Sequence, residues 1–159
     1  DKTPELIEAC KVSLLDRGFG QKSGANGSGW GTANKVNLWA RAKDGNRAYS
    51  MLRELINKNI APNLWDFHPP YQMDGNCGYT SGVCEMLCYS SDDIIELLPA
   101  LPEEWKNGSV KGLCARGGYS LDFTWENGEI KSLSVYSSCG KKTARIKTGD
   151  EIKTVKTVG

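Results

Sequence analysis

The sequence predicts an α+β protein in which about four helices, within residues 1–92, precede an antiparallel β-sandwich-like domain at residues 93–159. Two observations support this prediction. Apolar side chains recur at helical spacing in the first half of the chain, whereas beyond Asp92 they alternate with period two. Pro99 and Pro102 interrupt the chain where the pattern changes. The length of 159 residues suits one domain, or one domain with a smaller companion.

The first helix is expected at residues 4–17, with Thr3 as its N-cap and a proline in its first turn. Residues 18–29 are rich in glycine, and we expect them to be the most mobile internal segment. Because the chain opens directly on a helix start with no targeting pattern, we also expect it to be cut from a longer protein.

Three more helices are expected at residues 31–42, 45–58 and 76–90, the third helix of the chain being capped by Asp44. Gly78 and Gly82 in the last of them each cost about 1 kcal/mol relative to alanine. We therefore expect these two glycines where a neighbouring backbone packs closely.

The second half of the chain shows strand patterns. Tyr119, Leu121, Phe123 and Trp125 alternate with polar residues, which favours a buried core face. Asn127–Gly128 is a strong hairpin signal. Further antiparallel strands are expected near residues 110–115, 130–137, 143–147 and 152–158.

Charge and cysteine content exclude several classes of function. The 20 basic and 19 acidic side chains nearly cancel, which gives no reason to expect a nucleic-acid partner. No apolar stretch approaches the about 20 residues that a membrane span needs, so we expect a soluble protein. The six cysteines form no CxxC pair and there is a single histidine, so neither a metal site nor a cofactor is expected. Cys84 and Cys88, four residues apart on the predicted helix, are expected to fill the core.

Residues 63–76 form the densest unusual segment. They combine two carboxylates, an imidazole, three amides and three aromatic rings with Pro69 and Pro70, which stiffen the backbone. Carbohydrate sites need this mixture, because aromatic rings cover the C–H face of a sugar while polar groups bind its hydroxyls. From composition alone, the alternative remains open that the histidine is structural and that Asp74 caps the following helix.

The run His68–Asn76, HPPYQMDGN, resembles the HPPFQIDGN stretch of glycoside hydrolase family 95. Upstream, KVNLWAR at residues 35–41 and DGNRAY at 44–49 resemble helices of the same family. Downstream, LLPALP at residues 97–102 and the segment 108–119 resemble its passage into a C-terminal β-domain.

This resemblance implies the end of an (α/α)6 barrel in an enzyme that hydrolyses alpha-L-fucosides, or alpha-L-galactosides, with inversion. It implies that Asp74 is catalytic, helping asparagine side chains to activate water, and that His68 binds a sugar hydroxyl. The partner would be a fucosylated oligosaccharide or glycan. The compartment stays open: secreted, periplasmic or cytoplasmic in a bacterium.

The family's general acid and partner asparagines lie upstream of the matched segment. The resemblance therefore implies that this chain alone is catalytically incomplete. Since four helices cannot close a barrel of twelve, we expect the helical part either to self-associate or to change its packing.

Three alternatives concern the binding residues. The β-domain could instead be a carbohydrate-binding or purely structural module without catalysis, with Tyr119, Phe123 and Trp125 as its apolar face. Trp30 and Trp39 are candidates for sugar platforms, but packing is the commoner role of such aromatics. Gln72 and Asn76 could likewise bind hydroxyls, although loop and cap roles are commoner for them.

Overall fold

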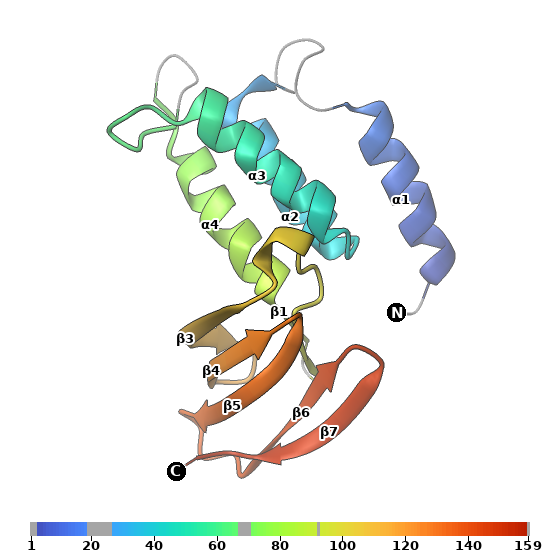
Figure 1. Ribbon diagram of the computed structural model, residues 1–159, viewed down its shortest axis with the longest axis vertical. Coiled ribbons are helices and arrows are strands. Elements are labelled where there is room, and N and C mark those ends of the chain that lie inside the picture. Colours follow the sequence, from blue (N-terminus) through green and yellow to red (C-terminus); the bar gives the residue numbers. More distant parts are fainter. Residues whose placement is uncertain (1–2, 19–26, 67–70, 92, 159) are drawn as a thin grey trace.

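The computed structural model describes residues 3–18, 27–66, 71–91 and 93–158. Within them, helices precede strands, as predicted (Figure 1). The helices are α1 (Pro4–Asp16), α2 (Gly29–Arg41), α3 (Gly45–Asn59) and α4 (Met73–Leu87), and a short 3-10 helix follows at Glu103–Trp105. The strands are β1 (Cys88–Ser90), β2 (Ile95–Leu97), β3 (Gly108–Ala115), β4 (Tyr119–Glu126), β5 (Glu129–Ser137), β6 (Thr143–Thr148) and β7 (Glu151–Lys156).

Capping side chains set the starts of α2 and α3. The Ser28 hydroxyl accepts a hydrogen bond from the backbone N–H of Gly31 at 3.2 Å, so α2 begins earlier than the predicted residue 31. The Asp44 carboxylate accepts a hydrogen bond from the N–H of Arg47 at 3.0 Å, which confirms it as the cap of α3. Thr3 occupies the N-cap position of α1, but its side chain makes no capping hydrogen bond.

The predicted bounds of the fourth helix are wrong at both ends. The helix begins at Met73 and ends at Leu87, so Asp74 lies in its first turn and not in a preceding bend. Residues 88–90 leave the helix because they pair with β2 as an antiparallel strand, a long-range contact that local spacing cannot reveal. The predicted mobile segment falls mostly on residues 19–26, outside the described residues.

The cysteine prediction is also corrected. Because Cys88 lies on β1, it does not share a helix face with Cys84. Cys84 is exposed and does not fill the core, whereas Cys88 is half-buried against the β-domain core.

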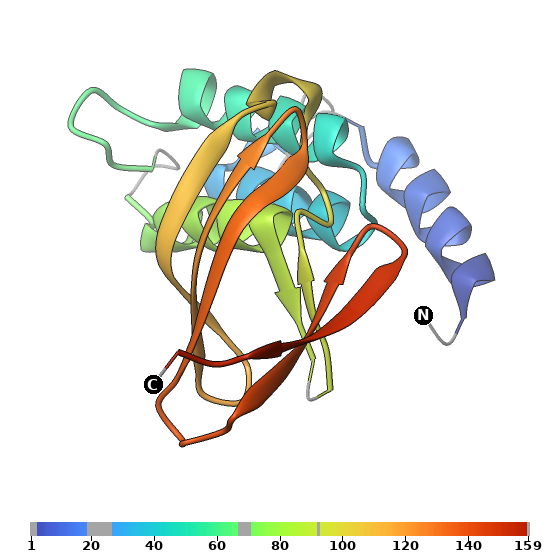
Figure 2. The ribbon, with the colours of Figure 1, turned by 60° about the horizontal axis from the view of Figure 1, so that its bottom comes forward.

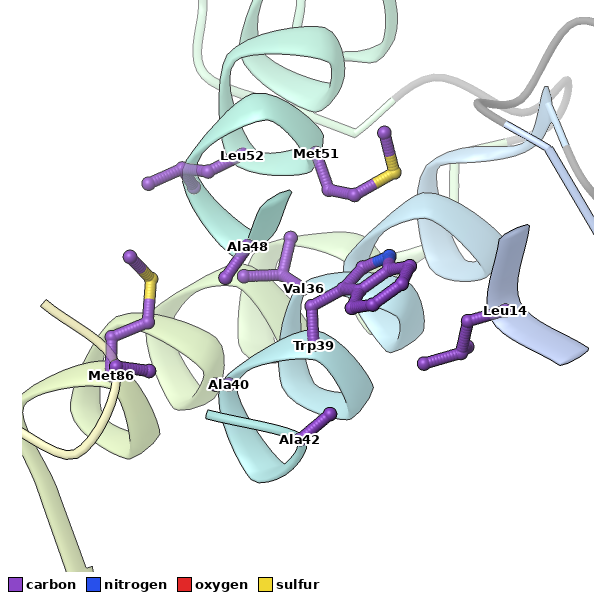
Figure 3. Close-up of a cluster of buried hydrophobic side chains, with 10 residues drawn as sticks. Leu14, Val36, Trp39, Ala40, Ala42, Ala48, Met51, Leu52 and Met86 are labelled. Atoms are coloured by element: carbon purple, nitrogen blue, oxygen red, sulfur yellow. The ribbon is translucent and has the colours of Figure 1, made fainter. Parts of the chain in front are cut away.

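α2, α3 and α4 pack side by side around one apolar core, and α1 stands at their edge (Figure 1). Figure 3 shows this core, in which Trp39, Met51 and Met86 are buried. A Cβ added at Gly78 would lie 2.8 Å from the Ala33 Cβ. Close packing at the α4 glycines is thus confirmed, although the nearest atoms belong to side chains of α2.

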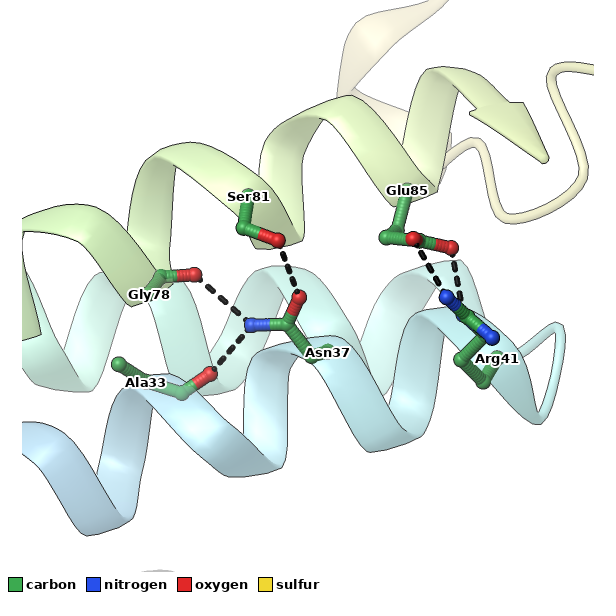
Figure 4. Close-up of polar contacts among 6 residues, drawn as sticks. All are labelled: Ala33, Asn37, Arg41, Gly78, Ser81 and Glu85. Atoms are coloured by element: carbon green, nitrogen blue, oxygen red, sulfur yellow. Dashed lines mark hydrogen bonds and ion pairs between the residues drawn. The ribbon is translucent and has the colours of Figure 1, made fainter. Parts of the chain in front are cut away.

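Polar contacts also join α2 to α4 (Figure 4). The Asn37 amide donates to the carbonyl oxygen of Gly78 at 2.8 Å and accepts a hydrogen bond from the Ser81 hydroxyl at 3.0 Å. Arg41 donates two hydrogen bonds to Glu85, at 2.6 and 2.7 Å, and these raise the pKa of the arginine. The helix that carries Asp74 is therefore fixed along its length.

Lys35 attaches the end of α1 to α2. Its ammonium, in a side chain only 4% exposed, donates to the carbonyl oxygens of Arg17 at 3.3 Å and Gly18 at 2.7 Å. Burial, and then the charge of Arg17, lower the pKa of Lys35.

The strands form two sheets, one of order β1-β2-β6-β7 and one of order β3-β4-β5. β1 continues directly from α4, and β7 lies at the far edge (Figure 2). One pairing differs from the prediction, since β2 and β6 run parallel. The three strands between them in sequence form the long connection that a parallel pairing requires.

The β-domain core lies between the sheets. Leu121, Phe123 and Trp125 are at most 5% exposed, so the alternating face of β4 is packed and does not present a sugar platform. Asn127 and Gly128 have φ of 51° and 79° and connect β4 to β5, as the predicted hairpin requires.

An ion pair and an aromatic contact are among the interactions that join the helices to the β-domain in the described ranges. The buried Glu96 carboxylate lies 3.0 Å from the Lys43 ammonium, just after α2, and 3.1 Å from that of Lys147 on β6. Trp105 packs edge-on against Tyr49 of α3 and accepts a hydrogen bond at its carbonyl from the Trp125 indole at 2.8 Å. The division predicted near residue 92 stays a prediction. In the described ranges, no helix is long and apolar enough to cross a membrane.

Candidate functional site

The candidate site lies at the start of α4 and in the loop before it. Residues 60–66 form a tight bend, closed by a bridge between Ile60 and Asp66. The N–H of Ala61 donates to the carbonyl oxygen of Trp65 at 2.8 Å, and Leu64 adopts a positive φ of 67°. A non-glycine residue in this conformation is uncommon, and here hydrogen bonds on both sides of it hold the bend.

Asn76 connects this bend to α4. Its amide nitrogen donates to the carbonyl oxygen of Leu64 at 2.6 Å, and its amide oxygen accepts a hydrogen bond from the N–H of Asp66 at 3.0 Å. Both halves of the amide are used by the backbone, so Asn76 acts as a clamp. The loop role that the sequence favoured for Asn76 agrees with this contact.

Trp65 and Tyr71 form an exposed aromatic pair on either side of residues 67–70. Their ring centroids are 4.6 Å apart with an interplanar angle of 35°. The side chains are 54% and 40% exposed. Because Trp65 sits on a bend held by hydrogen bonds, this pair presents a fixed apolar face to solvent.

Asp74 is the second residue of α4 and is exposed. An acidic side chain in the first turn of a helix is favoured by the helix dipole. Among the described residues it has no hydrogen-bond or ion-pair partner, so its carboxylate is free to bind another molecule. The other predicted site residue, His68, lies outside the described residues, and the structure therefore does not test whether the two meet.

Asp66 is the residue to which the sequence assigned no role. Its side chain is 1% exposed, and its carboxylate lies between the starts of α2 and α4. A Cβ at Gly29 would overlap one carboxylate oxygen, and a Cβ at Gly75 would overlap the other. The signal in the sequence was the pair of glycines, which becomes meaningful only when the two helix starts are brought together.

The remaining candidates for sugar binding, Trp30, Trp39 and Gln72, differ in their exposure. Trp39 is 2% exposed and belongs to the helical core, whereas Trp30 is 41% exposed. Gln72 is the N-cap residue of α4 but makes no side-chain capping bond. Its amide oxygen is buried and has no hydrogen-bond partner in the described part of the chain.

Within the described ranges, no group of three or more His, Cys, Asp or Glu side chains is placed to hold a metal ion. The six cysteines are free thiols. What the described residues offer is the exposed carboxylate of Asp74, close in sequence to the exposed Trp65–Tyr71 pair, and these group types suit a polar ligand with an apolar side, such as a sugar.

Residues 1–87 match the glycosyl hydrolase family 95 catalytic domain, and residues 89–158 match the glycoside hydrolase family 95 C-terminal domain. The chain is 35% identical to Alpha-L-fucosidase 2 of Arabidopsis thaliana over 149 residues, which cover 86% of the chain and 17% of the relative. It is also 35% identical to Probable alpha-fucosidase A of Aspergillus oryzae over 139 residues, or 77% of the chain and 19% of the relative.

A protein of the same name from Aspergillus niger is 31% identical over 159 residues, which cover 89% of the chain and 20% of that relative. The chain thus spans at most 20% of the length of these curated relatives. The two family matches together cover nearly every residue, with the helices in one and the strands in the other. The chain belongs to glycoside hydrolase family 95.

Proposed function

We propose that this chain is the C-terminal part of an inverting alpha-L-fucosidase, in which Asp74 is a catalytic residue and His68 binds the sugar. The substrate class is an alpha-L-fucoside or alpha-L-galactoside within a glycan. In this proposal residues 1–92 complete an (α/α)6 catalytic barrel, and residues 93–159 form its β-domain. In the full-length enzyme of this proposal, the chain is joined to the preceding part of that catalytic domain.

The observation that carries the proposal is the exposed carboxylate of Asp74 in the first turn of α4. Most acidic side chains with such freedom are ordinary surface residues. This one stands on a helix whose far end and middle are joined to α2 by Arg41–Glu85 and Asn37–Gly78 contacts. A carboxylate on a rigid helix keeps a fixed position, and because other side chains hold the helix, the carboxylate itself stays available for catalysis.

Inversion needs a water molecule on one face of the sugar and a proton donor on the other, with the two catalytic groups roughly 6.5–9.5 Å apart. In the proposed mechanism Asp74 acts on the side of the water. An amide oxygen is a weak base, but a nearby carboxylate polarises it and helps it to accept a proton as the water attacks the anomeric carbon. The leaving oxygen takes its proton from a general acid supplied by the upstream part of the enzyme.

The aromatic pair supports the same assignment. Trp65 and Tyr71 flank the segment that contains His68, and Tyr71 is close in sequence to Asp74. Their exposed face suits the C–H side of a pyranose ring. The proposal therefore places the sugar between this face and the start of α4.

The test is Asp74→Asn in the full-length enzyme, assayed with an aryl alpha-L-fucoside. We expect kcat to fall by roughly 10²–10⁴-fold, the usual contribution of a group that assists proton transfer. Asp93→Asn is the matched control, because Asp93 is an exposed aspartate in the same chain, and its kcat should stay within about twofold of the parent. Near-normal turnover by Asp74→Asn would rule out the catalytic role.

The proposal also states that the 159-residue chain by itself is inactive. Hydrolysis of the aryl fucoside by the purified chain would contradict this. Inactivity of the chain, together with activity of the full-length enzyme under the same conditions, is the expected result.

Self-association of the isolated chain is the last part of the proposal. An apolar groove of about 380 Å³ runs between α1 and α2, lined by residues that include Leu6, Ile7 and Leu38. We expect a second copy to cover it when the upstream part is absent, because large exposed apolar surfaces favour association. Light scattering should show a dimer that Leu6→Lys disrupts, while Val12→Lys, an exposed α1 position outside the groove, leaves it intact.

A further inference from the structure

We propose that Asp66 is a positioning residue for Asp74: its buried carboxylate, seated between the starts of α2 and α4, holds the first turn of α4. This inference rests on the proposed catalytic role of Asp74 and adds a second residue to that site. Asp66 itself faces the interior and is not exposed to a substrate.

The carboxylate fills the space that the two helix starts leave between them. It lies so close to Gly29 and Gly75 that a methyl group on either glycine would overlap one of its oxygens. Gly29 is the first residue of α2, and Gly75 is the residue directly after Asp74 in α4. A displacement of the Asp66 side chain would therefore shift the backbone next to Asp74.

Electrostatics favour a carboxylate at this place. The start of a helix has unpaired backbone N–H groups and about half a unit of positive charge. Two such starts meet at Asp66. The N-cap residue of α4, Gln72, makes no side-chain capping bond, so the helix lacks a cap from its own first residues. Asp66 lies against the third helical residue, whose N–H is the usual partner of a capping oxygen.

The backbone of Asp66 is fixed as well. It pairs with Ile60 in an isolated bridge, and its N–H donates to the Asn76 side chain at 3.0 Å. Side chain and backbone thus both contact the first turn of α4, at Gly75 and Asn76, the two residues that directly follow Asp74. A misplacement of a reacting group by about 1 Å can cost roughly 10²-fold in rate, so this support has a kinetic consequence.

The experiment compares Asp66→Asn with Asp44→Ala in the full-length enzyme. Asp66→Asn keeps the shape of the side chain and removes its charge, and we expect kcat to fall roughly 10–100-fold while KM stays within about threefold. Asp44→Ala removes the cap of α3 and so should also destabilise a helix start. It is the control because that helix start does not carry Asp74. Its Tm should fall with kcat unchanged, when both variants are assayed well below their Tm.

A kcat for Asp66→Asn equal to the parent's, or a fall no larger than that of Asp44→Ala at the same loss of Tm, would overturn the inference. The double variant Asp66→Asn, Asp74→Asn provides the second measurement. If Asp66 acts through Asp74, adding Asp66→Asn to Asp74→Asn should change kcat less than about twofold. If Asp66→Asn lowers kcat as much in the Asp74→Asn background as it does in the parent enzyme, the two residues act independently, and the positioning role is contradicted.

Failure of this inference is distinguishable from failure of the proposed function. Loss of turnover in Asp74→Asn with normal turnover in Asp66→Asn would remove only the positioning role. Normal turnover in Asp74→Asn would remove the proposed function and the inference with it.

Asn76→Ala keeps the inference testable if Asp66→Asn fails to fold. Asn76 is half-buried, and its removal frees the bend from α4 without changing any charge. We expect the same selective fall in kcat, about 3–10-fold, with KM little changed. An unchanged kcat in a folded Asn76→Ala variant would overturn the inference.

Discussion

The side-chain amide of Asn37 on α2 donates a hydrogen bond to the backbone carbonyl oxygen of Gly78 on α4 at 2.8 Å. It also donates to Ala33 within its own helix at 2.9 Å and accepts a hydrogen bond from Ser81 at 3.0 Å (Figure 4). One amide therefore uses its donors and its acceptor to hold together the two helices whose starts enclose the Asp66 carboxylate.

Asn37→Ala should lower the free energy of unfolding of the chain by about 1–2 kcal/mol, because the hydrogen bonds between the helices are lost. Urea unfolding followed by circular dichroism measures this value. Asn34→Ala, at an exposed position about one turn earlier on α2, should change it by less than about 0.5 kcal/mol. Equal losses in the two variants would contradict the role of Asn37.

Glu96→Gln should destabilise the contact between the helices and the β-domain. The Glu96 side chain is buried and pairs with Lys43 at 3.0 Å and Lys147 at 3.1 Å, so its neutralisation leaves two ammonium groups facing each other. We expect a loss of about 1–3 kcal/mol in the free energy of unfolding. Glu151→Gln, which removes an exposed pair with Lys153, should cost less than about 0.5 kcal/mol. Similar costs would show that burial of Glu96 adds nothing.

Cys88 should resist alkylation at pH 8. The pKa of the Cys88 thiol is raised to about 12. Burial is the main cause, and the charges of Glu85 and Cys84 add to the shift. Since the thiolate is the reactive form, iodoacetamide should label the exposed Cys10, Cys77 and Cys139 before it labels Cys88. Peptide mass spectrometry identifies the order, and early labelling of Cys88 in the folded chain would contradict the shift.

The same thiol makes stability depend on pH. In the unfolded chain it ionises near its ordinary pKa of 9.0, but in the folded chain it stays protonated to about pH 12. Its contribution to stability is complete below pH 9 and is lost as pH rises from there, by at most about 1.4 kcal/mol per pH unit. Cys88→Ala should flatten the decline of unfolding free energy between about pH 9 and 10.5, and an unchanged slope would count against the prediction.

Trp65→Ala in the full-length enzyme should raise KM about 5–20-fold, with kcat lowered less than about threefold. The change removes the larger ring of the exposed pair with Tyr71. Packing of a sugar against such a ring contributes about 1–2 kcal/mol to binding. Steady-state kinetics with a fucosylated oligosaccharide separates the two constants. Leu64→Ala is the control, because Leu64 is the adjacent and more exposed residue of the same bend but has no ring. A similar rise in KM for both variants would argue against stacking.

Several features of the site could be predicted from the residues alone, and others could not. The resemblance predicted a catalytic role for Asp74 and a sugar-binding role for His68; both stay predictions, and the structure describes Asp74 as exposed. Asp66 received no role, because its carboxylate lies against Gly29 and Gly75, which are far from each other in the chain. The start of α4 was misplaced for a related reason: Asp-Gly-Asn is typical of a turn, but here Asn76 binds the preceding bend and the helix begins at Met73.

The sequence by itself determined the order of helices before strands, the Asp44 cap, the Asn127–Gly128 hairpin and the buried face of β4. These features depend on residues a few positions apart, so local spacing is enough to specify them. Only the tertiary structure decided that β2 pairs in parallel with β6 and that two helix starts enclose the Asp66 carboxylate. Both depend on which distant segments come into contact, and that choice is made by the packing of the whole core and not by any local pattern.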